Sequence, residues 1–467
     1  MITHKEIKNL EIEWGIREDI IEKDHVIGWI LWGIGSDPYF SEKWVFKGGT
    51  CLKKCYVETW RFSEDLDFTL VPPDSPIDPD EIEENLKKLL ERLHDESGID
   101  FSVQELALRS SEDPYYLEVR IYYRGPRNAP NPGRVKLDLN SSEKIITPSL
   151  FQKINHPYSD TLPSPYHVKC YSFEEVFAEK IRAMGERSRP RDLYDIINLF
   201  RRKFQSEKSD NIKDLLAMKC QTKNILIPTF ESITNHPVGA ELISEWENML
   251  GHQLPKLPPF NSFWDELPKL FDWLEGRYIS KRVPTFSFRD DEDRSWTAPP
   301  TVQSWGFSFP LEKIRYAAAN QLCVELGYKN AKRIIEPYSL RRTEGGNLLL
   351  HSIKKNTREH RAYRVDRIQS AEITDISFTP KYKIELTASG PMQDLPAKKK
   401  HVRLSRRPRK SKRLSYQSRS IPKYIFECPI CTNKFKRKIN DSKLRAHKDK
   451  NGSPCPGRTA IFLGRKY

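Results

Sequence analysis

The stretch Lys47–Phe68 reads KGGTCLKKCYVETWRFSEDLDF and decides the expected fold of the first part of the chain. The apolar residues before Lys47 predict a short buried strand, which ends in the glycine turn Gly48-Gly49-Thr50. We expect a helix after this turn and then a second strand that carries Asp65 and Asp67. Residues i and i+2 of a strand face the same side about 6.5–7 Å apart, so the two carboxylates point together.

Paired carboxylates beside a glycine turn predict metal-assisted phosphoryl transfer. Mg²⁺ is often held by one or two carboxylates together with substrate phosphates. A glycine turn that opens a helix lets backbone N–H groups approach a phosphate. A further strand carries Asp138 between apolar neighbours, where it could add a third acid to the pair. The alternative is a surface pair and an ordinary turn, but the combination of all three features favours the site.

The flanking sequence predicts a multidomain α+β protein. Residues 1–170 read as helix, strand, helix and several strands, an α/β core. Residues 171–283 read as helical, and Ser172 with Glu175 forms the pattern of a capping box. In this segment Lys180 and Arg187 lie on one helix, and Asp192 and Asp195 share a face of the next. Such groups could bind phosphate, or Arg187 and Asp195 could belong to a structural ion-pair network.

The stretch KGGTCLKKCYVETWRFSEDLDF, together with EKIRAMGERSRPRDLYDI, resembles the AbiEii/AbiGii-type nucleotidyltransferase toxins. The resemblance covers roughly residues 15–280 and implies the fold of the DNA polymerase β-like superfamily. It implies that the triphosphate of an NTP substrate is held by Lys47, Gly48, Gly49 and Thr50. It also implies that Asp65 and Asp67 hold catalytic Mg²⁺, that Lys180 contacts the nucleotide phosphates, and that Asp192 belongs to the cleft. Asp138 is the weaker catalytic assignment, because the family pattern says less about a third acid.

A second small domain is expected over residues 305–388, after a Pro-rich linker at 284–304. Residues 311–328 read as one helix, and a meander of short strands follows. The segments IIEPYSLRRTEGGNLLLHS and HRAYRVDRIQSAEITDISFTPKY resemble a WYL domain, which implies a small SH3-like β-barrel. A ligand pocket would then use Tyr338, Arg341, Arg364 and Arg367. The arginines that flank Asp366 could equally form structural ion pairs.

The last part of the chain predicts a zinc module behind a basic linker. Residues 389–422 are too polar to bury a core, and we expect a disordered linker there. Residues 423–467 carry four ligands with metal-site spacing: Cys428, Cys431, His447 and Cys455. Four such protein ligands suit a closed, structural Zn²⁺ site. The remaining five cysteines are scattered along the sequence, and we interpret them as packing residues.

The charge of the chain is divided very unevenly. Residues 391–467 contain 23 Lys and Arg against 4 Asp and Glu, a balance of +19 within a total of +14. The preceding 390 residues therefore carry −5. A basic tail on an acidic body predicts a polyanionic partner, with nucleic acid first in line. The alternative is a tail that serves solubility.

Composition excludes several classes of protein. No apolar run approaches the ~20 residues that a membrane span needs, and the N-terminus lacks a secretion signal. Eight cysteines in 467 residues are too few for a disulfide scaffold. We therefore expect a protein of the bacterial or archaeal cytoplasm with no membrane partner.

Two hypotheses of function follow. The first is a Mg²⁺-dependent nucleotidyltransferase, the toxin of a toxin–antitoxin or phage-defence system, with a nucleic-acid acceptor such as tRNA and a possible antitoxin partner. The second is a nucleotide-sensing DNA- or RNA-binding regulator that works through its WYL-like and zinc modules. The intact pair Asp65 and Asp67 favours the enzyme, because a sensor need not keep two metal ligands. A kinase-like phosphotransferase could use the same cleft.

Overall fold

The computed structural model divides the chain into two compact units, residues 1–398 and residues 399–467. It describes residues 1–57, 61–203, 209–237, 239, 241–277, 284–296, 311–386, 423–437 and 441–466. The expected basic linker at 389–422 lies outside these residues. No helix among them is long and apolar enough to cross a membrane.

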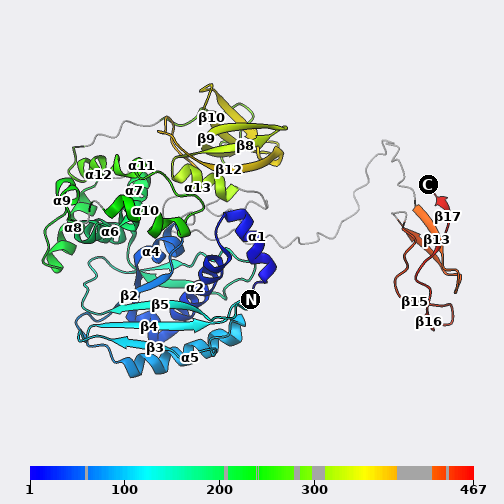
Figure 1. Ribbon diagram of the computed structural model, residues 1–467, viewed down its shortest axis with the longest axis horizontal. Helices are drawn as coiled ribbons and strands as arrows, with labels where there is room; N and C mark the ends of the chain where they lie inside the picture. The colour runs from blue at the N-terminus through cyan, green and yellow to red at the C-terminus, as the bar shows by residue number, and fades with distance from the viewer. Residues whose placement is uncertain are drawn as a thin grey trace, which may run out of the picture. The chain divides into compact units, whose positions relative to one another are not determined.

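A seven-stranded mixed sheet forms the centre of the first part of the chain (Figure 1). Its strand order is β3-β4-β5-β2-β1-β7-β6. The strands are β1 (Trp44–Lys47), β2 (Asp65–Leu70), β3 (Ala107–Ser110), β4 (Tyr116–Tyr123), β5 (Gly133–Asn140), β6 (Leu150–Lys153) and β7 (His167–Cys170). Strand β2 runs antiparallel to β1 and parallel to β5, so this pairing brings residues 44–47, 65–70 and 133–140 together.

The two faces of this sheet differ, as the alternation in β2 and β5 requires. Leu66, Phe68 and Leu137 are fully buried and belong to one hydrophobic core with the helices of the same part. These helices are α2 (Glu18–Ser36), α3 (Pro38–Lys43) and α5 (Pro79–Ser97), whereas Ile7 of α1 (His4–Trp14) belongs to a separate hydrophobic cluster. Because successive side chains of a strand point to opposite faces, Asp65, Asp67 and their neighbours lie on the other face.

The described residues between 173 and 274 are mainly helical, as predicted. The helices are α6 (Phe173–Arg187), α7 (Pro190–Lys203), α8 (Asp210–Thr222), α9 (Phe230–Thr234), α10 (Glu241–Leu250), α11 (Asn261–Trp264) and α12 (Leu267–Leu274). The Ser172 hydroxyl accepts the backbone N–H of Glu175 and caps α6. The Glu175 carboxylate instead accepts the N–H groups of Ile146 and Thr147, so it ties α6 to the loop after β5 rather than completing a capping box.

A five-stranded antiparallel sheet follows, with the order β11-β10-β9-β8-β12. It contains β8 (Leu322–Tyr328), β9 (Ala331–Arg342), β10 (Leu348–Lys354), β11 (His360–Arg364) and β12 (Ile368–Ser377), and it packs against α13 (Leu311–Ala319). The prediction of one helix over 311–328 is wrong. The helix ends at Ala319, Gln321 has a left-handed φ of 55°, and residues 322–328 pair with β9 and β12. Hydrogen bonding of residues 322–328 to a strand on each side outweighs the helical spacing of their apolar residues.

Residues 284–296, which the sequence assigns to a linker, lie against this sheet. The Phe286 ring stacks on His360 and Tyr382, with centroid distances of 4.3 and 4.1 Å. The buried Glu292 forms a β-bridge with Thr343. This part of the expected linker therefore belongs structurally to the five-stranded sheet.

The second unit is small and built from short strands. Strands β13 (Lys423–Glu427), β14 (Lys434–Arg437) and β17 (Ile461–Lys466) form one sheet, and β15 (His447–Lys448) pairs with β16 (Pro454–Cys455). Its core is a cluster of five buried residues that includes Cys428 and Cys455. A hydrophobic core of this size needs an additional cross-link, such as a bound metal ion, to be stable.

Candidate active site

The carboxylates predicted from the sequence meet on one face of the seven-stranded sheet. In the parallel pairing of β2 with β5, Asp67 lies opposite Asp138 and Asp65 lies opposite Lys136. Asp138 accepts the Tyr116 hydroxyl at 2.7 Å through one oxygen and the Lys136 ammonium at 2.7 Å through the other. The Lys136 ammonium is also 3.9 Å from the Asp65 carboxylate. Asp138 is therefore a third acid beside the pair, held by two polar neighbours.

The crowding of negative charge appears in the pKa values of the pair. Burial, together with the Asp138 and Asp65 carboxylates, raises the pKa of Asp67 from 3.8 to about 6, although Lys47 and Lys180 lower it. Burial and Asp138 also raise the pKa of Asp65, against the nearby Lys136. A divalent cation between these carboxylate oxygens would stabilise their ionised forms and lower both pKa values again. The donor set therefore fits Mg²⁺.

The glycine turn is built to bring the helix start against Asp67. Strand β1 ends at Lys47, and α4 (Gly48–Cys51) begins directly and continues as a π-helix, η1 (Leu52–Tyr56). Gly48 has a φ of 82°, and a Cβ there would lie 2.3 Å from the Asp67 carboxylate. Any side chain at this position would push the carboxylate away from the turn.

Thr50 joins the glycine turn to the start of β2. Its side chain is buried, and its hydroxyl donates to the backbone carbonyl of Asp65. The hydroxyl thus fixes the start of β2 beside the turn.

Lys180 and Asp192 lie in a buried network between α6 and α7. The Lys180 ammonium is 2.8 Å from Asp195 and 3.8 Å from Asp192. Arg187 donates two hydrogen bonds to Asp192, at 2.8 and 2.9 Å, and Asp192 is fully buried. The network therefore holds Lys180 in place, and Asp192 acts in it as an anchor for Arg187 and Lys180.

Arg61 completes this network and was missed in the sequence. Its Nε and Nη2 atoms each donate to Asp195 at 2.8 Å, and Nη1 donates to the Gln253 side chain at 2.9 Å. A Cβ at Gly49 would lie 2.6 Å from Arg61 Nη2, so the guanidinium packs on the glycine turn. The signal in the sequence is an arginine four residues before Asp65.

We expect the Arg61→Met variant to be strongly destabilised. Removing one partner of a buried ion pair leaves the other charge poorly compensated, which typically costs about 3–5 kcal/mol. Urea denaturation followed by tryptophan fluorescence would measure the change in the free energy of unfolding. Arg61→Lys should lose less, because one charge remains near Asp195. A loss below about 1 kcal/mol for the methionine variant would contradict this account of the network.

The four residues of the expected ligand pocket differ in burial and in their partners. Tyr338 and Arg341 are buried, and Arg341 donates to the carbonyl of Phe286 at 2.7 Å and pairs with Glu292 at 3.3 Å. Arg364 forms a surface ion pair with Asp366 at 2.7 Å, as the structural alternative predicts, and Arg367 is exposed. Residues 284–296 thus cover the buried half of the expected pocket.

The four predicted zinc ligands lie together in the second unit. Their ligand atoms are all within 4.8 Å of one another. Cys431 Sγ is 3.3 Å from His447 Nε2, and Cys428 Sγ is 3.8 Å from Cys455 Sγ. The other ring nitrogen of His447 is 3.0 Å from the Arg445 carbonyl, which is the outer contact that metal-binding histidines usually make. The donor set fits tetrahedral Zn²⁺.

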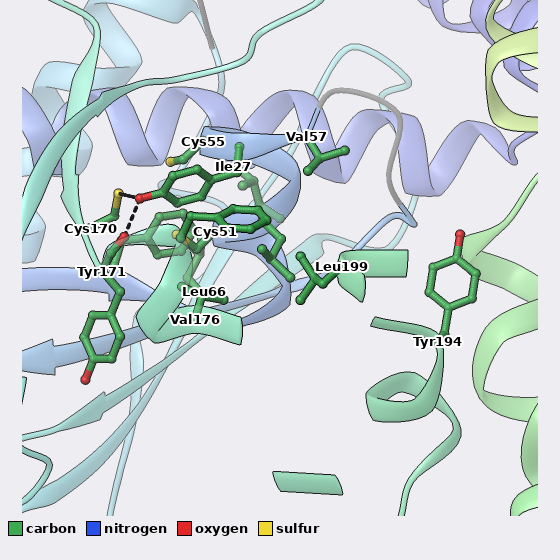
Figure 2. Close-up of a cluster of buried hydrophobic side chains, with 14 of the residues drawn as sticks. Ile27, Cys51, Cys55, Val57, Leu66, Cys170, Tyr171, Val176, Tyr194 and Leu199 are labelled. Atoms are coloured by element: carbon green, nitrogen blue, oxygen red, sulfur yellow. Dashed lines mark hydrogen bonds between the residues drawn. The ribbon is translucent and has the colours of Figure 1, made fainter. Parts of the chain in front are cut away.

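Three cysteines that look scattered in the sequence also meet, behind the glycine turn. The sulfur atoms of Cys51, Cys55 and Cys170 lie within 4.8 Å of one another, and Figure 2 shows them among apolar side chains such as Leu66. Burial raises the pKa of the Cys51 and Cys55 thiols, whereas hydrogen bonds from these two thiols lower the pKa of Cys170. All three side chains are buried. This group therefore packs the core under the turn, as predicted for each cysteine alone.

The glycine turn, the acids on neighbouring strands and the facing helical network define a nucleotidyltransferase. Residues 29–275 match the family described as "Nucleotidyl transferase AbiEii toxin, Type IV TA system", so the chain belongs to the AbiEii nucleotidyltransferase toxins. Membership in this family implies an antitoxin partner.

Among solved structures, the chain is similar to MenT4, a nucleotidyltransferase toxin from Mycobacterium tuberculosis H37Rv. The TM-score is 0.44 with 19% sequence identity, over 59% of this chain and 90% of that chain. No curated protein matches this chain in sequence.

Proposed function

We propose that this AbiEii-family protein transfers a nucleoside monophosphate from an NTP to a nucleic-acid acceptor such as tRNA, and that the transfer requires Mg²⁺. The observation that carries the proposal is the placement of Asp65, Asp67 and Asp138 on one sheet face beside the Gly48 turn. Oxygen ligands at this position suit a cation that bridges protein and phosphate.

Each side chain has a part in this chemistry. An acceptor hydroxyl oxygen forms a bond to the α-phosphorus and its proton passes to solvent water, while the bond between the α-phosphorus and the oxygen that bridges it to the β-phosphorus breaks and pyrophosphate leaves. Asp65 and Asp67 would hold Mg²⁺, which activates the attacking oxygen and stabilises the leaving one. Lys180, steadied by Asp195 and Asp192, offers positive charge to the phosphates from the helical side. Asp138 stands beside the pair on the side of Lys136 and Tyr116.

The basic tail is proposed to bind the acceptor. Residues 391–467 carry a balance of +19, and the second unit folds as a separate compact body. Four zinc ligands leave no open coordination position, so the module would bind rather than catalyse. Its lysines would contact phosphates, while the chemistry takes place at the sheet of the first unit.

Incubation of the purified protein with each labelled NTP, total cellular RNA and Mg²⁺ tests the proposal. We expect label from one NTP, or a subset of them, to enter an RNA band, and EDTA to prevent this. RNA that stays unlabelled with every NTP, in the presence of Mg²⁺ and folded protein, would overturn the proposed acceptor class.

We expect a zinc chelator to unfold the second unit selectively. Zinc binding supplies most of the folding free energy in modules of this size. The loss should appear as proton-NMR signals of residues 423–466 collapsing to unfolded positions, while the far-UV signal of the helices persists. Cys428→Ser should behave in the same way. Retention of the folded signals after complete removal of zinc would show that the four ligands only pack together.

A further inference from the structure

The Glu143 carboxylate lies between two lysines at the edge of the active site. It forms an ion pair with the Lys47 ammonium, and the Lys223 ammonium is 3.8 Å from its other oxygen. Lys47 is the last residue of β1, whereas Lys223 caps the end of α8 in the helical part. Glu143 itself sits in the turn after β5, where its backbone N–H donates to the Asn140 side chain at 3.0 Å. Two separate parts of the first unit therefore converge on one carboxylate.

This group of charges adjoins the acid pair directly. In the pairing of β1 with β2, Lys47 lies opposite Asp67, and its charge lowers the pKa of Asp67. Lys47 also precedes Gly48, the first residue of the turn. Asp67 of the acid pair therefore neighbours Lys47, Lys47 contacts Glu143, and Glu143 contacts Lys223.

The chemistry described above does not use Glu143. A carboxylate that is held between lysines from two different elements occupies the place that an external anion would take. A phosphate oxygen carries the same charge and accepts the same hydrogen bonds, and lysine is a common point-charge ligand for phosphate. The side chains of Lys47 and Glu143 are 13% and 15% exposed and that of Lys223 is 36% exposed, so this group of charges is most accessible to solvent at Lys223.

We propose that Lys47 and Lys223 form the subsite for the terminal phosphates of the NTP, and that Glu143 is an internal anion that a bound triphosphate displaces. The inference rests on the proposed function and adds its polyphosphate subsite. With the α-phosphorus at the acid pair, the β- and γ-phosphates extend past Lys47 toward Lys223. The leaving pyrophosphate is then held by lysines from both parts of the unit, and Glu143 competes with it and favours its release.

The two charges predict opposite effects on binding. Glu143→Gln removes the competing anion and keeps the side-chain shape, so it should tighten the binding of inorganic tripolyphosphate severalfold. Lys223→Met removes a ligand and should weaken this binding about tenfold, the value of one charge-assisted contact. AMP, which lacks the β- and γ-phosphates, should bind equally to wild type and to both variants.

Calorimetric titration of the full-length protein with tripolyphosphate in the presence of Mg²⁺ tests this inference at fixed ionic strength. Glu84→Gln and Lys88→Met are matched controls, because they make the same charge changes in an exposed ion pair on α5. Their affinity should equal that of wild type. Far-UV circular dichroism confirms that each variant is folded.

A Glu143→Gln variant that binds tripolyphosphate no better than wild type, or more weakly, would overturn the inference. Glu143 would then be a structural tie between the sheet and α8. An unchanged affinity of Lys223→Met would overturn it as well. In both cases NTP transfer by wild type would leave the proposed function intact. Absence of both tripolyphosphate binding and NTP transfer in wild type would overturn the two together.

Discussion

Asp67→Asn is expected to abolish nucleotide transfer and, without added metal, to leave the protein as stable as wild type or more stable. The variant loses one charged oxygen ligand of the pair. The loss in rate should be at least about 10²–10³-fold, the range for removing one electrostatic contact to a transition state. Activity with a labelled NTP and the thermal unfolding midpoint at pH 7 would be measured on the same preparation.

The sign of the stability effect follows from the pKa of this carboxyl. Folding raises the pKa of Asp67 from 3.8 to about 6, chiefly through burial. Above pH 6 the group is ionised in both states, and the folded state bears the cost of the buried charge. The stability that the protonated group contributes is therefore lost as pH rises from about 4 to about 6. Asparagine carries no such charge, so its stability lacks this part of the pH dependence.

Asp95→Asn provides the matched control, since it makes the same change at an exposed residue of α5. It should keep full activity and the wild-type midpoint. If Asp67→Asn were folded and fully active, Asp67 would not be a metal ligand. If it were inactive because it failed to fold, Asp65→Asn would supply the same test on a more exposed carboxylate.

Deletion of residues 399–467 is expected to separate acceptor binding from NTP binding. This segment is the second compact unit, and its 22 Lys and Arg against 3 Asp and Glu give it a net charge of +19. Phosphate contacts release counterions, so acceptor affinity falls with salt by a log–log slope of roughly 0.7 per contact for single strands. The truncated protein should show a flatter slope and a higher apparent KM for nucleic acid, with NTP affinity unchanged. Fluorescence anisotropy across a salt series would measure the slope.

A charge-reversal variant of the tail strengthens this experiment. Replacing Lys434 and Lys436 with glutamate keeps the four zinc ligands and the chain length, so any loss of acceptor binding would come from charge. Equal affinity of full-length and truncated protein at every salt concentration would make the tail a device for solubility or a contact for a protein partner.

The sheet face on which Asp65, Asp67 and Asp138 lie could be predicted from the sequence, because the alternation of side chains along a strand assigns it. The patterns DLDFTL and KLDLN each place apolar side chains on one face and acids on the other. The register that sets Asp67 opposite Asp138 joins residues 71 positions apart in the chain and follows from packing of the whole sheet. The local sequence pattern therefore predicts which acidic residues share a face of the sheet. The strand order and register determine which of these residues lie next to each other.

The residues that the sequence missed depend on partners far along the chain. Arg61 bonds Asp195 and Gln253, which are 134 and 192 positions away, and no local pattern indicates such contacts. The cysteines behind the turn meet because β7 pairs with β1 at Phe46 and Cys170. The resemblance assigns Thr50 to phosphate, and its hydroxyl donates to the backbone carbonyl of Asp65. The helix expected over 311–328 ends early because residues 322–328 find strand partners on both sides.

The position of the label in the NTP tests the central claim most directly. The purified protein would be incubated with Mg²⁺, RNA and the preferred NTP, labelled either at the α-phosphate or at the γ-phosphate. Nucleotidyl transfer predicts that the α-label enters the RNA and that the γ-label leaves as pyrophosphate. Transfer of the γ-label to RNA would mean that the acids at the sheet serve a kinase and would contradict the account.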